Sequence, residues 1–306
     1  MDCNMIGQSP LLIEALERAD KAANSAARVL VTGETGTGKE MLARRIHAGS
    51  RRAMKPFVAL NCASLSPELM ESELFGHVKG AFTTALRDHG GLVAQADGGT
   101  LFLDEIAEMA PALQAKLLRF IETGEYRRVG EASLRRADVR VIAATHRDLR
   151  GGDFRDDLYF RLAVVTIAMP PLRDRAADIP LLAAHFLTAI AAQENRAPLR
   201  LDASALAALQ RHSWPGNIRE LHNTLYSAAV MHDGDTLTAA MLALPALEDS
   251  MKLMREAAKP QPLWRVEQAA IDAAIDYCGG NIPHAARLLE VSPSTLYRRP
   301  KNRARV

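Results

Sequence analysis

The chain has 306 residues, of which 48% are hydrophobic, and a net charge of only +2. This length can bury a large core and form two or three domains, while the charge says little about partners. Cys3, Cys62 and Cys278 lack the spacing of metal ligands or of a disulfide framework, and we expect Cys62 to be a small buried residue. We see no run of about 20 apolar residues and no signal peptide, which predicts a cytoplasmic protein.

The first elements are a helix, a strand and a glycine-rich turn. Ser9 and Pro10 are typical of an N-cap and a first helical turn, and the strand is expected at residues 28–32. Glycines in such a turn let backbone N–H groups point at an anion, and the lysine that follows can reach the β- and γ-phosphates. The pattern predicts a nucleotide-binding loop, with an ordinary strand–helix turn as the alternative. Its residues are Gly33, Glu34, Thr35, Gly36, Thr37, Gly38, Lys39 and Glu40.

Glu40 stands where this loop usually carries a hydroxyl ligand of Mg²⁺, so a metal must be held mainly from elsewhere. Further strands are expected at 58–60, before Asn61, at 100–104 and at 139–145. The second of these ends in Asp104 and Glu105, at the edge where ligands of α/β sheets bind. Asp104 would orient Mg²⁺ and Glu105 would polarise an attacking water. The alternative is that both acids simply cap a helix.

Helical periodicity dominates residues 179–244, interrupted at Pro198 and at 214–217, and predicts a small helical domain. Residues 247–262 mix charges and prolines without an apolar face and are expected to be a linker. The expected fold is α/β, a parallel sheet flanked by helices, followed by a helical lid and a small all-α unit. The expected divisions are 1–170, 171–246, 247–262 and 263–306.

The last unit has the pattern of a helix-turn-helix. Helices are expected at 263–278 and 281–290, and a turn then leads into a second short helix that Pro300 ends early. This helix would enter the major groove of DNA, and the basic end of the chain fits a DNA footprint. A solvated basic tail is the alternative. The candidate DNA-binding residues are Ser292, Ser294, Thr295, Tyr297, Arg298 and Arg299.

Taken together, these motifs resemble the bacterial enhancer-binding proteins, AAA+ ATPases that activate transcription by RNA polymerase carrying sigma-54. The resemblance covers nearly the whole chain, and its last unit is similar to the Fis-type DNA-binding domain of that family. The family normally has glutamate after the lysine, as at Glu40. Other matching segments are residues 71–77, 104–105, 154–161, 171–175 and 214–221.

The resemblance implies a hexameric ring that uses ATP and Mg²⁺. Arg155 and Arg161 match the arginine-finger region, which acts on the γ-phosphate in a neighbouring subunit. Arg219 matches the lid arginine that senses nucleotide phosphates, and Asn61 the residue that restrains the catalytic glutamate. The alternatives are surface pairs of the two finger arginines with Asp156 and Asp157, a helix-surface ion pair for Arg219 and a strand-end cap for Asn61.

The family contacts sigma-54 through a loop of sequence GAFTGA, matched here by Gly80, Ala81, Phe82, Thr83, Thr84 and Ala85. Thr84 replaces the second glycine, and a β-branched residue restricts the backbone there. His146 stands where the family usually has an asparagine sensor beside the γ-phosphate, and it can still donate a hydrogen bond. Val78 replaces a glutamate that is common before the loop.

The chain starts almost at the ATPase unit, so we expect no regulatory domain before it and a possible separate regulatory protein. The resemblance implies an activator that binds upstream DNA and remodels the closed complex of sigma-54 RNA polymerase. Because the loop is altered at Thr84, the alternative is a repressor or a sigma-54-independent activator in which nucleotide mainly controls oligomerisation. A generic ATPase that does not bind DNA is a third reading.

Overall fold

The computed structural model describes residues 5–82, 85–232, 234–244, 263–279, 281–289, 291, 292, 294 and 296. It divides into two compact units, Met1–Leu244 and Pro245–Val306, which are described separately. The expected linker at 247–262 lies outside the described residues, and the domain divisions drawn from the sequence remain a prediction.

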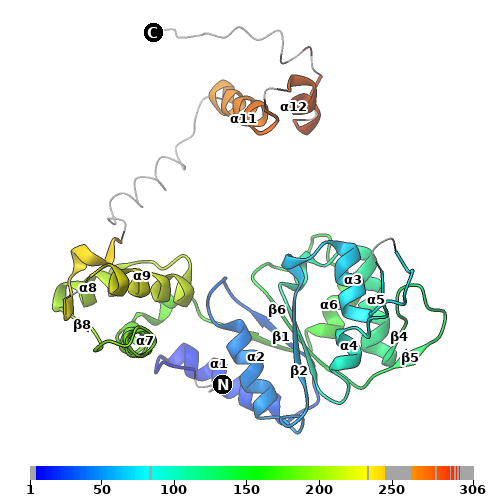
Figure 1. Cartoon of the computed structure of the whole chain (residues 1–306), viewed down its shortest axis with the longest axis horizontal. Helices are drawn as coiled ribbons and strands as arrows, with labels where there is room; N and C mark the ends of the chain where they lie inside the picture. The colour runs from blue at the N-terminus through cyan, green and yellow to red at the C-terminus, as the bar shows by residue number, and fades with distance from the viewer. Residues whose placement is uncertain are drawn as a thin grey trace. The chain divides into compact units, whose positions relative to one another are not determined.

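A five-stranded sheet forms the centre of the first unit (Figure 1). All of its neighbouring strands are parallel, as the sequence predicts. The pattern missed the edge strand at residues 165–168, which is short and only partly buried. The strand order is β2 (Phe57–Asn61), β3 (Thr100–Asp104), β6 (Arg140–Thr145), β1 (Val29–Thr32) and β7 (Val165–Ala168).

Helices cover both faces of the sheet (Figure 1). Successive side chains of a strand point to opposite faces, so Leu30 packs into one core while Val29 and Val31 pack into the other. The first core is covered by α3 (Pro67–Phe75), α4 (Leu92–Gln95), α5 (Pro111–Thr123) and α6 (Asp156–Leu162). The second is covered by α1 (Pro10–Ala23) and α2 (Lys39–Ala48). Burial on both faces explains the continuous apolar runs in the sequence.

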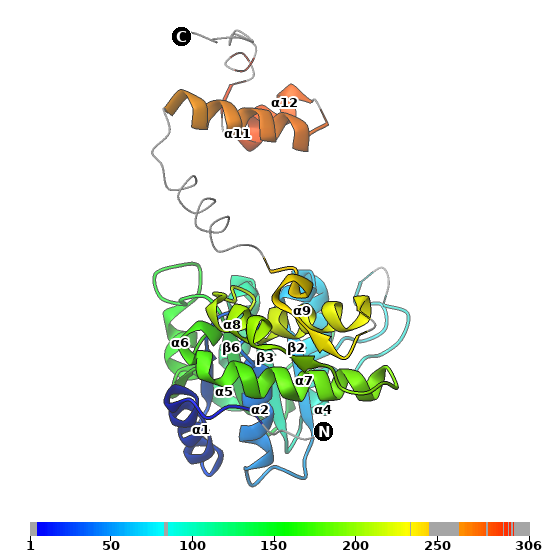
Figure 2. The same cartoon turned by 90° about the vertical axis from the view of Figure 1, so that its left-hand side faces the viewer.

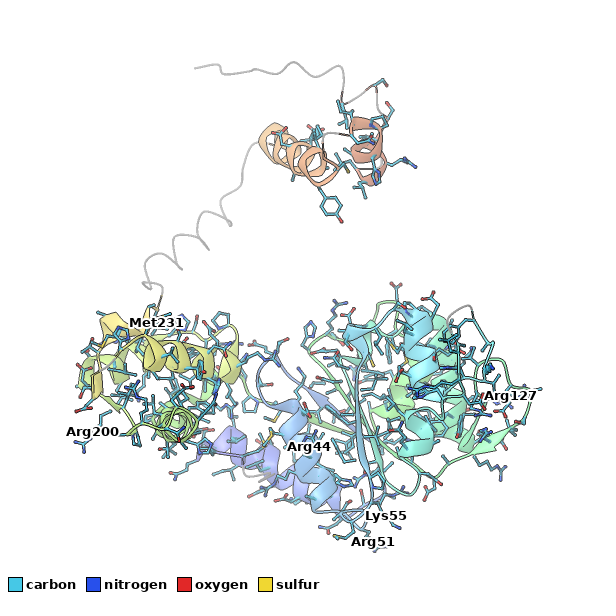
Figure 3. The ribbon with its side chains drawn as sticks, in the orientation of Figure 1. Arg44, Arg51, Lys55, Arg127, Arg200 and Met231 are labelled. Atoms are coloured by element: carbon cyan, nitrogen blue, oxygen red, sulfur yellow. The ribbon has the colours of Figure 1, made fainter. Side chains whose placement is uncertain are left out.

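Two local details differ from the sequence prediction. Helix α1 begins at Pro10 as expected, but the Ser9 hydroxyl donates to Asp178 Oδ2 at 2.8 Å instead of capping the helix. An antiparallel hairpin of β4 (Glu125–Tyr126) and β5 (Arg135–Arg136) was not expected, since each strand has only two residues. Arg127 lies beside it at the edge of this unit (Figure 3).

The C-terminal part of the first unit is a helical lid with its own core around Trp214, which is fully buried. Its α7, α8 and α9 lie together in Figure 2. The lid also contains a two-stranded parallel pair, which helical periodicity could not reveal. Its elements are η3 (Leu172–Asp178), α7 (Ile179–Gln193), β8 (Arg200–Leu201), α8 (Ala203–Arg211), α9 (Asn217–Met231), β9 (Thr236–Leu237) and η4 (Ala239–Leu242).

One helical stretch, Leu172–Gln193, is long and apolar enough to meet the criterion for a membrane span, contrary to our expectation from the sequence. Its four charged residues all lie within residues 172–178, and the alanines and leucines that follow raise the mean hydropathy. Leu182, Leu187 and Ile190 of this stretch are buried in the lid core. The same composition therefore serves as the central helix of a folded lid.

The second unit contains α11 (Leu263–Tyr277) and α12 (Ile282–Leu288). Asn281 caps α12 by accepting the His284 N–H at 3.1 Å, and Ala285 and Ala286 are fully buried. Helix α12 ends two residues before the expected end at 290. Helix α12 corresponds to the first of the two helices expected in the helix-turn-helix, and much of the turn and second helix lies outside the described residues.

Candidate nucleotide site

The glycine-rich turn connects β1 to α2 in a conformation that requires its glycines. Gly36 and Gly38 have φ angles of +80° and +99°, in the region that side chains rarely adopt. The Lys39 Nζ atom donates to the carbonyls of Gly33 at 2.9 Å and Glu34 at 3.3 Å, and its side chain is only 6% exposed. Thr37 is fully buried, and its hydroxyl donates to the Glu34 carbonyl at 2.8 Å. The loop therefore curls around the lysine.

A cavity of about 670 Å³ opens above this loop and the carboxyl ends of β2, β3 and β6. It brings together most of the residues that the sequence singled out for nucleotide chemistry. Those that line it are Thr35, Gly36, Gly38, Lys39, Glu40, Asn61, Asp104, Glu105, His146 and Arg219. Gly33 and Thr37 complete the loop, and Glu40 also forms an ion pair with Arg44, at 2.7 Å, within α2.

Asp104 and Glu105 lie at the end of β3, where parallel pairing sets Asn61 beside Asp104. Burial, followed by the charge of Glu105, raises the pKa of Asp104. Burial also acts to raise the pKa of Glu105, but the His146 hydrogen bond and the charge of Lys39 outweigh it, so that this pKa is lowered. Glu105 therefore stays ionised at neutral pH beside a cation.

Two basic side chains hold Glu105. Its Oε1 atom is 3.4 Å from Lys39 Nζ, and its Oε2 atom is 2.6 Å from His146 Nδ1. Asn61 is placed differently, because its side chain accepts the Ala63 N–H at 2.8 Å. Asn61 thus acts here as a strand-end cap, the alternative role considered from the sequence, and its action on Glu105 remains a prediction.

The donor set suits Mg²⁺ held mainly by phosphate and water. Asp104 offers a half-buried carboxylate at the cavity wall. Within the described part of the chain there is no group of three or more His, Cys, Asp or Glu side chains that could hold a metal. Mg²⁺ bound to a nucleotide is usually held by one or two carboxylates together with phosphates. Asp104 fits that role, with no protein cage around it.

Arg219 lines the cavity from α9, whereas the two finger arginines lie elsewhere. Arg155 pairs with Asp157 at 2.7 Å, one of the alternatives considered from sequence. Arg161 pairs with Glu122 of α5 at 2.8 Å, not with Asp156 or Asp157. Neither is among the described residues that line the cavity, and their contact with a phosphate stays a prediction.

The loop that matches the GAFTGA sequence folds back on its own base. Gly80 N–H donates to the Ala85 carbonyl at 2.9 Å, and Ala81 N–H donates to the Val78 carbonyl at 3.1 Å. The Phe82 ring lies edge-on to His77, with ring centroids 4.9 Å apart. Thr83 and Thr84 lie outside the described residues, so the effect of Thr84 stays a prediction.

The candidate DNA-binding residues are described only in part. Ser292 Oγ and Ser294 Oγ are 2.7 Å apart, in the segment that follows α12. Thr295, Tyr297, Arg298 and Arg299 lie outside the residues that the structure describes. Their contacts with DNA remain a prediction from the sequence.

The structure adds cavity residues that sequence reasoning missed. Arg175 is 2% exposed, and its Nη2 atom donates to the Thr37 carbonyl at 3.1 Å. Its motif was noticed, but nothing in that motif indicated a buried arginine. The other added residues are Met5, Ile6, Met41, Ala63, Glu108, Leu182, His185, Phe186, Ile218 and His222.

Known protein families match three successive parts of the chain. The Sigma-54 interaction domain matches residues 5–168, the AAA+ ATPase lid domain matches 173–259, and the Fis family of bacterial regulatory proteins matches 262–301. The regulatory protein LuxO of Vibrio cholerae is 44% identical over 96% of this chain and 68% of its own length. The transcriptional regulatory protein ZraR of Escherichia coli is 47% identical over 95% of this chain and 67% of its own length.

Solved structures agree with these matches. NtrX from Brucella abortus in complex with ATP is 34% identical, with a TM-score of 0.74 over 96% of this chain and 68% of that chain. A Thermotoga maritima RuvB mutant, at 16% identity and a TM-score of 0.52 over 95% of this chain and 85% of that chain, shows the likeness of fold alone. The fold expected from sequence, an AAA+ ATPase domain with a helical lid and a helix-turn-helix unit, is confirmed. The chain belongs to the family of sigma-54-dependent AAA+ transcriptional activators that carry a C-terminal Fis-type helix-turn-helix.

Proposed function

We propose that this chain hydrolyses ATP in the cavity above the glycine-rich loop and uses the energy to remodel the sigma-54 RNA polymerase closed complex. The observation that carries this proposal is the convergence of Lys39, Asp104 and Glu105 on one cavity. The same unit carries the loop that includes Phe82. ATP is the expected nucleotide, since NtrX, a similar chain, was solved with ATP.

The side chains have complementary tasks. Lys39 leaves its contact with Glu105 to bind the β- and γ-phosphates, and the ionised Glu105 then polarises the attacking water. When bound at Asp104, Mg²⁺ would neutralise charge on the phosphate oxygens. His146 holds Glu105 from the other side and is in place to orient its carboxylate. Asn61, at the cavity wall, is expected to restrain Glu105 when the loop is not engaged.

A ring completes this site. Arg155 and Arg161 are exposed and paired only with surface carboxylates, which a phosphate of a neighbouring subunit can replace. Arg219 would bind the nucleotide phosphates and so couple them to the lid of the same subunit. The expected assembly is a hexamer with a nucleotide site at each interface.

The contacts with the sigma factor and with DNA are expected at the Phe82 loop and in the second unit. We expect residues 80–85 to press on sigma-54 and the Fis-type unit to bind upstream double-stranded DNA through Ser292, Ser294, Thr295 and residues 297–299. The protein would act in the cytoplasm, and a separate regulatory protein could restrain the ring. Thr84, in place of glycine, favours the second candidate, a DNA-binding regulator that uses nucleotide mainly to oligomerise.

The decisive experiment is open-complex formation with purified sigma-54 polymerase on matched promoters. The chain should form open complexes with ATP, while Lys39→Ala and Glu105→Gln abolish them. Lys55→Ala changes an exposed lysine away from the cavity and serves as the matched control. ATP hydrolysis without open complexes on any matched promoter would favour the second candidate. Restoring glycine at Thr84 would then show whether the altered loop is the cause.

A further inference from the structure

Lid residues donate hydrogen bonds to the backbone carbonyl groups of the phosphate-binding loop. Asn217 Nδ2 donates to the Thr35 carbonyl at 3.0 Å, and Ile218 N–H donates to the Gly36 carbonyl at 3.0 Å. Arg175 Nη2 donates to the Thr37 carbonyl. Three successive carbonyls of the loop are thus bound by lid residues far along the chain.

The side chain of Glu34 extends this set of contacts. Its carboxylate accepts Arg173 Nη2 at 2.7 Å and Asn217 Nδ2 at 3.1 Å. The carboxylate therefore faces the lid, and only the backbone of Glu34 serves the loop. We call these contacts between residues 34–37 and lid residues Arg173, Arg175, Asn217 and Ile218 the clasp.

Asn217 is the centre of the clasp. It is fully buried, with a φ of +52° that asparagine tolerates better than most residues. Its Oδ1 atom accepts the Leu172 N–H at 2.7 Å, while its Nδ2 atom donates to two acceptors. These partners fix the orientation of the amide, because an oxygen in place of Nδ2 would face two further oxygens. Asparagine is thus required for its hydrogen bonds as well as for its backbone.

The clasp also sets the place of Arg219, which lies two residues after Asn217 and lines the cavity. A Cβ atom added to Gly36 would lie 3.2 Å from Arg219 Cβ and 2.3 Å from the Gly216 carbonyl oxygen. The loop and the start of α9 are therefore in backbone contact. A shift of Asn217 relative to the loop must carry Arg219 with it.

We propose that Asn217 is a positioning residue of the nucleotide site: through Glu34 and Thr35 it holds the phosphate-binding loop against the lid and so places Arg219 for the phosphates. This inference rests on the proposed function for its catalytic readout. It assigns the Asn217–Glu34 contact a role in nucleotide affinity, beyond a role in folding.

The test is Asn217→Asp in the full chain, which keeps the size of the side chain and places a carboxylate against Glu34. The KM for ATP and the Kd for ADP should both rise about tenfold, the order expected for losing a hydrogen bond to a charged group. The kcat should stay within about twofold, because uniform binding is lost and the catalytic groups are not. A mere folding defect would lower kcat through the active fraction and leave KM unchanged. Asn195→Asp is the matched control, since Asn195 is an exposed lid residue with a φ of +51°.

A rescue separates the specific contact from general damage. Glu34→Gln combined with Asn217→Asp restores a donor and an acceptor between these two side chains, while the Thr35 carbonyl still faces an oxygen. If the two residues are coupled, the double variant should therefore bind ADP more tightly than Asn217→Asp alone. Removing Arg219 should cost less affinity in Asn217→Asp than in the unmodified chain. If Asn217→Asp fails to fold, Glu34→Leu breaks the clasp at a partly exposed side chain and should raise the Kd for ADP similarly.

Unchanged ADP affinity in a folded Asn217→Asp or Glu34→Leu variant would overturn the inference, as would a double variant no better than Asn217→Asp alone. The proposed function fails separately, if the unmodified chain binds ADP but does not hydrolyse ATP. In that event the ADP affinities of the variants still decide the role of Asn217.

Discussion

Gly36 offers a direct measure of how closely the lid packs on the phosphate-binding loop. Its φ is +80°, and a Cβ atom there would lie 2.3 Å from the Gly216 carbonyl oxygen. Because that oxygen belongs to the backbone, no side-chain rotation can relieve the contact. The substitution Gly36→Ala must therefore push the turn at 214–216 away from the loop.

The cost can be built from the contacts that this movement breaks. An alanine held at positive φ costs about 1 kcal/mol, and the hydrogen bonds from Ile218 N–H to Gly36 and from Asn217 to Thr35 contribute about 1 kcal/mol each. We expect Gly36→Ala to lower the free energy of unfolding by about 3 kcal/mol, the sum of these three contributions. Nucleotide binding should weaken as well, since the loop loses its support.

Urea unfolding of the full chain measures this loss, and titration with ADP measures the change in affinity. Gly151→Ala is the control, because Gly151 has a φ of +77° and no described atom within 4 Å of its added Cβ. It should lose only the backbone contribution, about 1 kcal/mol. Equal losses in the two variants would refute the close packing of lid on loop.

Three further predictions follow from single side chains. Burial, and after it the nearby carboxylates, raises the pKa of the Cys62 thiol to about 12. Iodoacetamide at pH 8 should therefore label Cys62 only as the chain unfolds. Rapid labelling of Cys62, detected by mass spectrometry, would contradict its burial. The hydrogen bond from Arg173 holds the pKa of Glu34 below its ordinary value. The pair therefore stabilises the fold fully when the pH is above the ordinary pKa of glutamate, and this stabilisation is lost as the pH falls through the lowered pKa. Urea midpoints of Arg173→Gln should therefore lie below those of the unmodified chain at pH 7, with a gap that narrows under acid conditions; a constant gap would argue against the pair. Phe82→Ala should keep ATP hydrolysis but lose the formation of open complexes, because the Phe82 ring contacts His77 outside the nucleotide cavity. A parallel loss of both activities would show that the loop supports the nucleotide site.

Local patterns predicted the parts of the site that are local in the chain. The loop 33–40 and the strand ending in Asp104 each depend on neighbours within about ten residues, and both have the expected structure. The edge strand β7 escaped because it is short and only partly buried, so its sequence lacks the apolar run of a central strand. The pair β8–β9 has two residues in each strand, too few to show any periodicity.

Long-range partners could not be predicted in this way. Glu34 was expected to contact nucleotide, yet its carboxylate binds Arg173, which lies 139 residues away. Nothing in the motif around Arg175 indicates burial, yet folding buries this arginine between loop and lid, and burial lowers the pKa of its guanidinium. Such contacts depend on how the lid packs on the loop, and no local period in the sequence encodes that packing.

Glu105 shows how the two kinds of information combine. Its position after an apolar strand identifies it from sequence, but its backbone lies at φ +52° and ψ +49°, a conformation that costs a non-glycine residue about 1 kcal/mol or more. Contacts from two other elements hold it there, Lys39 of α2 and His146 after β6. Since β3 pairs with β6, the sheet places His146 next to one carboxylate oxygen. The phosphate-binding loop places Lys39 next to the other. The strained backbone thus accompanies the placement of this carboxylate at the cavity wall, and relaxing it would move the acid away from Lys39 and His146.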